Sequence, residues 1–467
     1  MERLIKIGNV KPKSALEVKI SRFGVGFEKL DRGLFDPNKA YDKAAQLGVK
    51  WVRLQSGWAR TEKEKGVYDF AWLDDIVDNL IKRGLKPWLC LCYGNALYTP
   101  EAAKVFGAVS CAPIETEEER NAWSNYVSAV ASHFKGRVEY YEVWNEASWL
   151  WTHIANEHQP NGTEYGEFVI STSKTIKKSD ENAKIIAGVE GLRKLWYTNK
   201  SFETGMGDHI DYFSFHTYTA DERKIMEKKR IIRGFLDKYN PKVKIIQGET
   251  GAPSKSGGHG EISWGAWTPK KQAKLLARRS ITDFMLDFEI SSYFSCIDMV
   301  EALNGRVDDR ASVLDYGYFG VLGAEFDENG ISTGEYTPKP SYKTLQTICS
   351  LFSDGAENAN LPISITPLES RRVFGMDVSE NIISGGFKKP NGSSAFAYWH
   401  SSDLMTTDFE STISMQVVPF GEIKLVDLLD GTIYKLPESM IEDNDGCLTL
   451  KNIPIRDYPL LLTFGDF

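Results

Sequence analysis

Apolar residues along the first three quarters of the chain gather in short runs, separated by stretches in which they recur at helical spacing. Most of the runs are not interrupted by polar residues, which is typical of strands buried on both faces of a parallel sheet. The stretches between them predict amphipathic helices. Eight strand cores are expected, at residues 23–27, 51–54, 87–92, 138–144, 184–189, 210–215, 243–247 and 290–297.

The number and order of these units favour a closed α/β barrel. Eight strand–helix alternations of this length fit a (β/α)₈ TIM barrel. An open sheet that binds a dinucleotide carries a glycine-rich turn after its first strand, and Gly24-Val25-Gly26 lacks the rest of that fingerprint. We therefore predict a (β/α)₈ barrel over residues 21–352, whose last helix covers residues 341–352.

The pattern changes after the predicted barrel. Short β-rich segments replace the strand–helix alternation, and Asp430-Gly431 is typical of a hairpin turn. Residues 353–467 therefore predict a C-terminal β-sandwich domain. Residues 16–20 alternate between apolar and polar side chains and predict one more strand. Because the barrel has no place for a ninth strand, we expect residues 1–20 to contribute it to the sandwich.

Composition limits the partners of the protein. The 467 residues carry a formal net charge of −8, which disfavours binding to nucleic acid or to an anionic membrane surface. No apolar run is long enough to cross a bilayer. The N-terminus has no apolar segment of the secretory type, which favours a cytoplasmic location, although a secreted protein without its leader would show the same pattern. The oligomeric state is left open.

The six cysteines form no disulfide framework in so long a chain. The sequence contains no Cys-x-x-Cys motif and no His-Glu-x-x-His motif, so it predicts neither a structural nor a catalytic metal. We expect no organic cofactor either.

Two glutamates at the ends of predicted strands indicate carbohydrate chemistry. The fourth strand stops at Trp144-Asn145-Glu146, and the seventh continues into Glu249. Strand carboxyl ends form the active face of a parallel barrel, so the two carboxyl groups are expected to face each other there. One can protonate the leaving oxygen of a glycoside while the other attacks the anomeric carbon at a separation of about 5–5.5 Å. An ordinary loop glutamate is the alternative at each position.

The sequence Tyr-Glu-Val-Trp-Asn-Glu of residues 141–146 resembles the acid/base strand of clan A glycoside hydrolases, most of all the β-xylosidase-like family 39. The resemblance covers residues 21–352 and implies retaining hydrolysis, with Glu146 as the acid/base and Glu249 as the nucleophile. It also implies four residues that contact the sugar or the nucleophile, namely Asn145, Arg53, His216 and Tyr218. Ala147 departs from the proline that this family usually carries after the acid/base.

The supporting residues have structural interpretations as well as functional ones. Arg53 can serve Glu249 directly or can pair with Glu142, which is predicted to point into the barrel. His216 can be an ordinary histidine at the barrel mouth, and Glu28 can bond sugar hydroxyls at the end of the first strand. Three tryptophans can stack on sugar rings or pack beneath loops, namely Trp149, Trp264 and Trp267.

We interpret the chain as a retaining glycoside hydrolase that removes units from the end of β-linked oligosaccharides or glycosides. An endo-acting clan A glycanase of the glucanase or mannanase type is the nearest alternative. A carbohydrate-binding barrel without catalytic activity is the alternative outside the enzymes. Both glutamates are present, which favours an enzyme.

Overall fold

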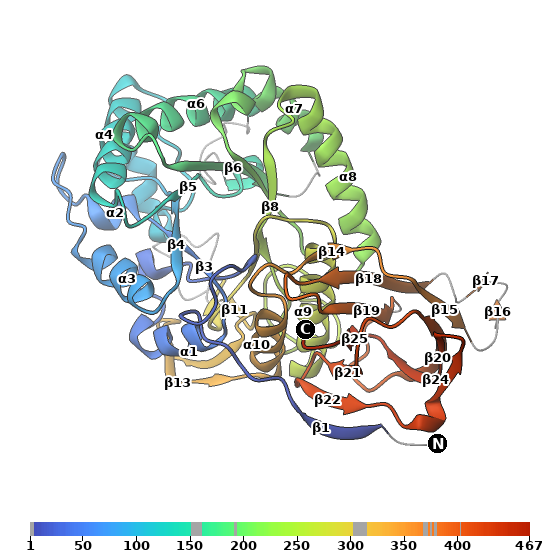
Figure 1. The fold of residues 1–467 in the computed structure, drawn as a ribbon. Coiled ribbons are helices and arrows are strands. Elements are labelled where there is room, and N and C mark those ends of the chain that lie inside the picture. The colour runs from blue at the N-terminus through green and yellow to red at the C-terminus, as the bar shows by residue number, and fades with distance from the viewer. Residues whose placement is uncertain are drawn as a thin grey trace.

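The computed structural model describes residues 4–150, 161–190, 194–301, 315–367, 372–373, 376–377, 381–401 and 403–467 (Figure 1). Eight parallel strands close into a barrel in sequence order, and the first pairs with the last. These strands are β2 (Phe23–Gly26), β3 (Trp51–Gln55), β4 (Lys86–Leu91), β5 (Tyr140–Val143), β6 (Lys184–Glu190), β7 (Tyr212–His216), β8 (Lys244–Thr250) and β9 (Ser291–Tyr293). The predicted (β/α)₈ barrel is confirmed.

One main helix follows each barrel strand, and the helices surround the barrel (Figure 1). They are α1 (Tyr41–Gln46), α3 (Ala71–Lys82), α4 (Glu117–His133), α6 (Gly162–Ser179), α7 (Leu195–Glu203), α8 (Glu222–Tyr239), α9 (Pro269–Met285) and α10 (Pro340–Leu351). Two short helices, α2 (Trp58–Thr61) and α5 (Ala147–Leu150), lie in loops after strands. The sequence explains the start of α4, because Thr116 and Glu119 form a capping box that satisfies free amide groups of its first turn.

The barrel interior is divided into an apolar layer and a polar layer. Large side chains from β3, β4, β6 and β8, and from the residue before β9, form one buried cluster: Trp51, Trp88, Ile186, Ile246 and Ile290. Nearer the carboxyl ends of β3 and β5, Arg53 and Glu142 point into the barrel and bond each other. This layering fills the barrel with side chains and leaves the polar groups at the end where active sites are built.

The C-terminal part forms two antiparallel sheets that pack over a shared apolar core. The larger sheet has the order β1-β22-β21-β25-β19-β18-β14, and the smaller has the order β15-β20-β24-β23. The strands are β1 (Ile5–Asn9), β14 (Glu357–Ala359), β15 (Ile363–Pro367), β18 (Ile382–Lys388), β19 (Ser394–His400), β20 (Glu410–Val417), β21 (Ile423–Asp427), β22 (Thr432–Lys435), β23 (Ile441–Asn444), β24 (Cys447–Arg456) and β25 (Leu460–Phe464). The predicted β-sandwich is therefore confirmed.

Three two-stranded ribbons complete the fold. They pair β10 (Met299–Val300) with β11 (Tyr316–Gly317), β12 (Leu322–Phe326) with β13 (Ser332–Pro338), and β16 (Arg372–Val373) with β17 (Met376–Asp377). The first two belong to the chain between β9 and α10, so they extend the connection that follows the last barrel strand.

An N-terminal strand does join the sandwich, but its predicted position was wrong. The strand is β1, which pairs with β22, whereas residues 15–17 form a turn. The turn is stabilised because the Glu17 carboxylate accepts hydrogen bonds from the Ser14 amide and hydroxyl, both at 2.8 Å. Of the three apolar residues in the alternation, Val18 is buried, but Leu16 and Ile20 are 70% and 65% exposed, so they do not share one buried face as a half-buried strand requires.

Helix α9 lies between the barrel and the sandwich, and it is buried on nearly every side. Its Lys274 ammonium pairs with Asp457 of the sandwich at 2.8 Å, with both side chains 0% exposed. Arg278 of the same helix bonds Glu222 at the start of α8, and Trp399 of β19 donates to that carboxylate at 3.2 Å. The two parts of the chain are thus joined by a buried ion pair and a buried hydrogen bond in addition to apolar packing.

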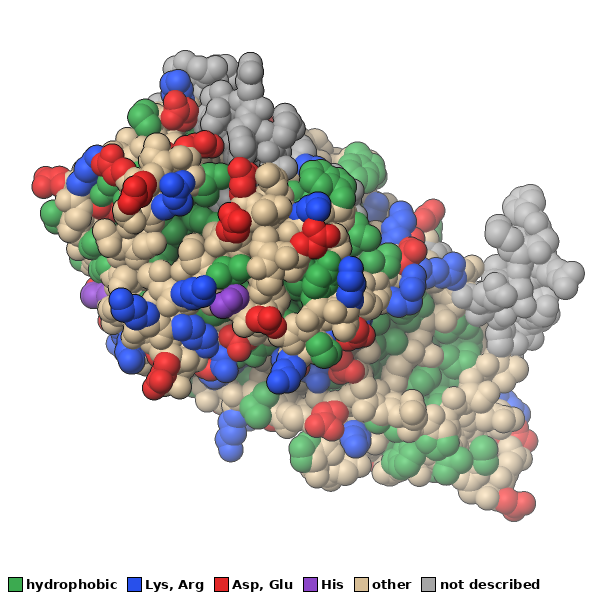
Figure 2. Space-filling view, turned by 90° about the horizontal axis from the view of Figure 1, so that it is seen from above, with side chains coloured by type: hydrophobic (Ala, Val, Ile, Leu, Met, Phe, Trp, Pro, Cys, Tyr) green, Lys and Arg blue, Asp and Glu red, His purple; other side chains and the backbone are tan. Residues whose placement is uncertain are grey.

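The surface in Figure 2 carries lysines and arginines interspersed with aspartates and glutamates. Charges of both signs therefore share this face. Among the described residues, no helix combines the length and the apolar character that a membrane crossing requires.

The Lys274→Met substitution is expected to lower the free energy of unfolding by roughly 3–5 kcal/mol, because it leaves the buried Asp457 carboxylate without its counterion. Chemical denaturation followed by tryptophan fluorescence measures the effect. Lys65→Met is the matched control, since Lys65 pairs with Glu118 in an exposed position and its loss should cost less than about 1 kcal/mol. Equal stability of the two variants would contradict the expected cost of leaving the Asp457 carboxylate buried without a counterion.

Candidate active site

The two glutamates lie at the carboxyl ends of the barrel strands, as predicted. Glu146 follows β5 and Glu249 belongs to the end of β8. Trp144 and Glu146 have φ angles of 67° and 49°, in the left-handed region that residues other than glycine rarely adopt. The buried Trp144 indole holds this turn, because it packs against Trp123 and Phe168. The backbone therefore turns sharply between the end of β5 and Glu146.

Arg53 of β3 lies at the centre of the site and is 0% exposed. Its guanidinium binds Glu142 of β5 through two hydrogen bonds of 2.7 and 3.0 Å. It also donates to Asn145 Oδ1 at 2.7 Å and to Glu249 Oε2 at 2.9 Å. Arg53 was expected either to serve Glu249 or to pair with Glu142, and its side chain does both.

Glu249 is surrounded by groups that favour its ionised form. Besides Arg53, the Tyr218 hydroxyl donates to Oε1 at 2.5 Å, and His216 Nδ1 lies 3.8 Å from Oε2. Burial by itself would raise the pKa of Glu249, but His216, Arg53 and Tyr218 together lower it below the usual range. A carboxylate that stays charged although its side chain is mostly buried is suited to act as a nucleophile.

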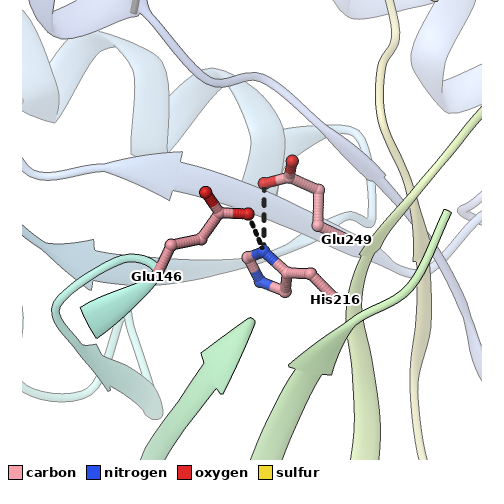
Figure 3. Close-up of side chains that lie close together, drawn as sticks. All are labelled: Glu146, His216 and Glu249. Carbon is pink, nitrogen blue, oxygen red and sulfur yellow. Dashed lines mark hydrogen bonds and ion pairs between the residues drawn. The ribbon is translucent and has the colours of Figure 1, made fainter. Parts of the chain in front are cut away.

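Glu146 faces Glu249 across His216 (Figure 3). His216 Nδ1 lies 2.9 Å from Glu146 Oε1, and oxygen atoms of the two glutamates approach within 4.8 Å of each other. Burial would lower the pKa of His216, but the charges of Glu249 and Glu146 raise it above its ordinary value. These three residues also offer donor atoms that could ligate a divalent cation, and the absence of a metal stays a prediction.

Asn145 is held in one orientation by bonds to both ends of its amide. Its Oδ1 accepts from Arg53, and its Nδ2 donates to the Tyr93 hydroxyl at 2.9 Å. Gln55 at the end of β3 also donates to Tyr93, at 3.1 Å. Tyr93 was not singled out from the sequence. Its only sequence signal is its place just after the third strand, since its partners come from distant parts of the chain.

Glu28 is buried beside Arg53 and is only 2% exposed. Its Oε1 is 3.4 Å from Arg53, and its Oε2 has no hydrogen-bond partner among the residues that the structure describes. Burial, assisted by the nearby charge of Glu249, raises the pKa of Glu28 to about 7 against the pull of Arg53. The structure thus brings Glu28 close to Arg53 and Glu249 in a buried position.

The tryptophans that were expected to contact sugar differ in their exposure. Trp264, in the loop after β8, is 74% exposed, whereas Trp267 is 7% exposed. The Trp267 indole donates to the carbonyl of Ile262 at 2.9 Å and packs against Leu275, which favours the structural interpretation for this residue. The Trp149 side chain lies outside the described residues.

The model of the family Glycosyl hydrolases family 39 matches residues 38–359, which is more than half of the chain. The chain belongs to this family. The match covers all barrel strands except β2 and includes both glutamates. The resemblance of residues 141–146 to family 39 is therefore confirmed on the scale of the barrel.

Relatives of known function and structure agree with membership in family 39. A β-xylosidase of Caldicellulosiruptor saccharolyticus is 23% identical over an alignment 348 residues long, and the alignment covers 67% of this chain and 64% of that protein. The chain therefore spans less than two thirds of that relative's length. A monomeric β-xylosidase from Caulobacter crescentus superposes with a TM-score of 0.60 at 15% identity, over 98% of this chain and 97% of the other.

An enzyme of known structure that is assigned to family 39 also shares the fold. The enzyme from Xanthomonas axonopodis pv. citri superposes with a TM-score of 0.59 at 15% identity, over 97% of this chain and 95% of the other. At such low identities the superpositions establish the shared architecture of barrel and sandwich, while the residue roles rest on the site itself.

Tyr218→Phe is expected to raise the pKa of Glu249, because the variant removes a hydrogen bond that favours the carboxylate over the acid. Titration of ¹³C-labelled glutamate side chains by NMR measures it, with Glu249→Gln to assign the signal. Tyr98→Phe is the matched control, since Tyr98 donates to Glu62 at 2.6 Å instead. An unchanged titration of Glu249 in the Tyr218 variant would refute the assigned bond.

Proposed function

We propose that the protein is a retaining glycoside hydrolase that acts by double displacement with Glu146 and Glu249. The observation that carries this proposal is the approach of the two carboxylates within 4.8 Å at the mouth of a barrel. Retaining enzymes place their carboxyl groups about 5–5.5 Å apart, whereas inverting enzymes need about 6.5–9.5 Å to admit a water molecule between carboxylate and sugar. The short separation supports retention.

Glu249 is the nucleophile in this proposal. Arg53, Tyr218 and His216 favour its charged form, and its side chain is still 13% exposed. Its carboxylate oxygen attacks the anomeric carbon while the bond from that carbon to the leaving oxygen breaks. The product of this step is a glycosyl ester on Glu249.

Glu146 acts as the general acid and then as the general base. Its side chain is 18% exposed and contacts His216. Glu146 and His216 share one proton in this proposal, and the Glu146 carboxyl group delivers it to the leaving oxygen. The resulting Glu146 carboxylate then removes a proton from water. The water oxygen attacks the anomeric carbon and releases Glu249, which restores the starting state.

Asn145 and Trp264 complete the binding site in this proposal. The Asn145 amide, fixed between Arg53 and Tyr93, bonds the sugar hydroxyl next to the anomeric carbon. The exposed Trp264 indole offers an apolar face against which a sugar ring can stack.

We further propose action on the ends of β-linked glycosides of the xylosidase type. The β-xylosidase from Caldicellulosiruptor saccharolyticus, which aligns over 67% of this chain, supports this substrate class. An endo-acting glycanase would cut polymers internally, and a carbohydrate-binding barrel would cut nothing, so both alternatives differ from this proposal in their products.

The purified protein is expected to hydrolyse at least one aryl β-glycoside in a panel of pentosides and hexosides, with β-xyloside among the substrates. Proton NMR of the reaction should detect the β-anomer of the free sugar first, because two inversions at the anomeric carbon restore its configuration. Initial release of the α-anomer would contradict double displacement. Failure to cleave any member of the panel, with measurable sugar binding, would favour the non-catalytic alternative.

A further inference from the structure

An ion pair between Lys29 and Glu301 lies on the active face, and the steps proposed above do not use it. Lys29 follows β2, and Glu301 follows β10. The Lys29 Nζ and Glu301 Oε2 atoms are 3.4 Å apart, with side chains 5% and 10% exposed. Lys29 Nζ also donates to the carbonyl of Val300 at 2.7 Å, which fixes the ammonium group in place.

Aromatic contacts connect this pair to the wall that carries the nucleophile. Lys29 Nζ lies 5.4 Å from the centre of the Phe294 ring. Phe294 contacts Phe319 at 5.9 Å between ring centres, and Phe319 contacts Tyr218 at 6.1 Å. Tyr218 is the residue that bonds Glu249. A series of aromatic contacts therefore connects the Lys29 ammonium to Tyr218, which bonds Glu249.

Hydrogen bonds connect the pair to the opposite wall. The backbone amide of Lys29 donates to Gln55 Oε1 at 2.9 Å. Gln55 in turn donates to the Tyr93 hydroxyl, which accepts from Asn145, the residue beside Glu146. Lys29 has a φ angle of 68°, in the left-handed region, so its backbone is held in a conformation that a lysine rarely adopts. Such strain is typical of functional sites.

Gly317 makes room for the Glu301 carboxylate. A Cβ atom at this position would lie 2.6 Å from Glu301 Oε1 and 2.7 Å from its Cγ atom. Burial raises the pKa of Glu301, and the charges of Glu249 and Glu146 raise it further against the pull of Lys29. Glu301 is therefore within electrostatic range of both glutamates proposed to act on the glycosidic bond.

The chemistry of the pair matches that of two neighbouring hydroxyl groups. An ammonium group only donates hydrogen bonds, an ionised carboxylate only accepts them, and a hydroxyl group does both. A buried ion pair stabilises a protein little, because its formation removes two charges from water. The presence of the pair at the edge of the site is explained if its charges bind a ligand. Hydrogen bonds to charged groups are stronger than hydrogen bonds between neutral groups.

We propose that Lys29 and Glu301 together bind the 3- and 4-hydroxyls of the sugar whose anomeric carbon is attacked. This inference rests on the proposed function and narrows its substrate class to neutral pyranosides in which both hydroxyls are free. A sugar carboxylate near these positions is disfavoured, because Glu301 would repel it. A glycone extended through its 4-hydroxyl would lose one of the bonds, which is consistent with action at chain ends.

The test combines deoxy substrates with variants. The wild-type protein, Glu301→Gln and Lys29→Met are assayed with the best aryl glycoside of the panel and with its 3-deoxy and 4-deoxy analogues. A lost hydrogen bond to a charged group should reduce kcat/KM about 10- to 100-fold. We expect the kcat/KM of the wild type to be reduced by this factor on one or both analogues, relative to the full substrate. On the full substrate, we expect the same reduction for each variant relative to the wild type. When a variant is given the analogue that lacks its partner hydroxyl, its kcat/KM should fall little further.

Each outcome bears on one of the two proposals. The role of the pair would be overturned if the losses in kcat/KM from the substitution and from the missing hydroxyl were additive, or if the variants equalled the wild type on the full substrate. It would also be overturned if the wild type cleaved both deoxy analogues as fast as the full substrate. This last comparison needs no substitution, so it holds even if the variants fail to fold. A wild type that cleaves no glycoside at all would instead overturn the proposed function, and this inference with it. Glu118→Gln, which breaks the exposed pair with Lys65, should leave all rates unchanged.

Discussion

The buried charge of Arg53 is the constraint on which the rest of the site depends. A guanidinium with no exposed surface is costly unless carboxylates and other acceptors surround it. Glu142 supplies the fixed counter-charge through two hydrogen bonds, and Trp88 secures that carboxylate from below at 3.0 Å. The remaining donors of Arg53 are then available at the mouth of the barrel, where they hold Asn145 and Glu249. One cation thus orients residues at the carboxyl ends of two strands, β5 and β8.

The sequence alone predicted the parts of this arrangement that follow from periodicity. Uninterrupted apolar runs identify parallel strands, and parallel strands bring Glu146 and Glu249 to one face of the barrel. Arg53 could also be predicted to pair with Glu142, because alternation along each strand fixes which side chains point inward. The family resemblance added the functions of the individual residues, which periodicity does not contain.

Contacts made by loops could not be predicted in the same way. Lys29 and Glu301 are 272 positions apart by their numbers, and no repeating pattern relates a residue after β2 to one after β10. Tyr93 presents the same difficulty, since its partners depend on how the ends of three strands meet. At the N-terminus, the alternating residues resembled a strand, but the local hydrogen bonds between Ser14 and Glu17 formed a turn instead. Local side-chain bonds outweighed the apolar pattern there.

The central claim is that Glu249 is the nucleophile and Glu146 the acid/base, and rescue by azide tests it most directly. Glu146→Ala and Glu249→Gly are each incubated with azide and an aryl β-glycoside whose leaving group needs little protonation, and the glycosyl azide is examined by NMR. Azide needs no general base, so Glu146→Ala should give the β-azide through the intermediate on Glu249. In Glu249→Gly no such intermediate can form, and direct attack in the vacated space should give the α-azide. The opposite pair of configurations would reverse the two roles, and full activity of either variant without azide would contradict the account.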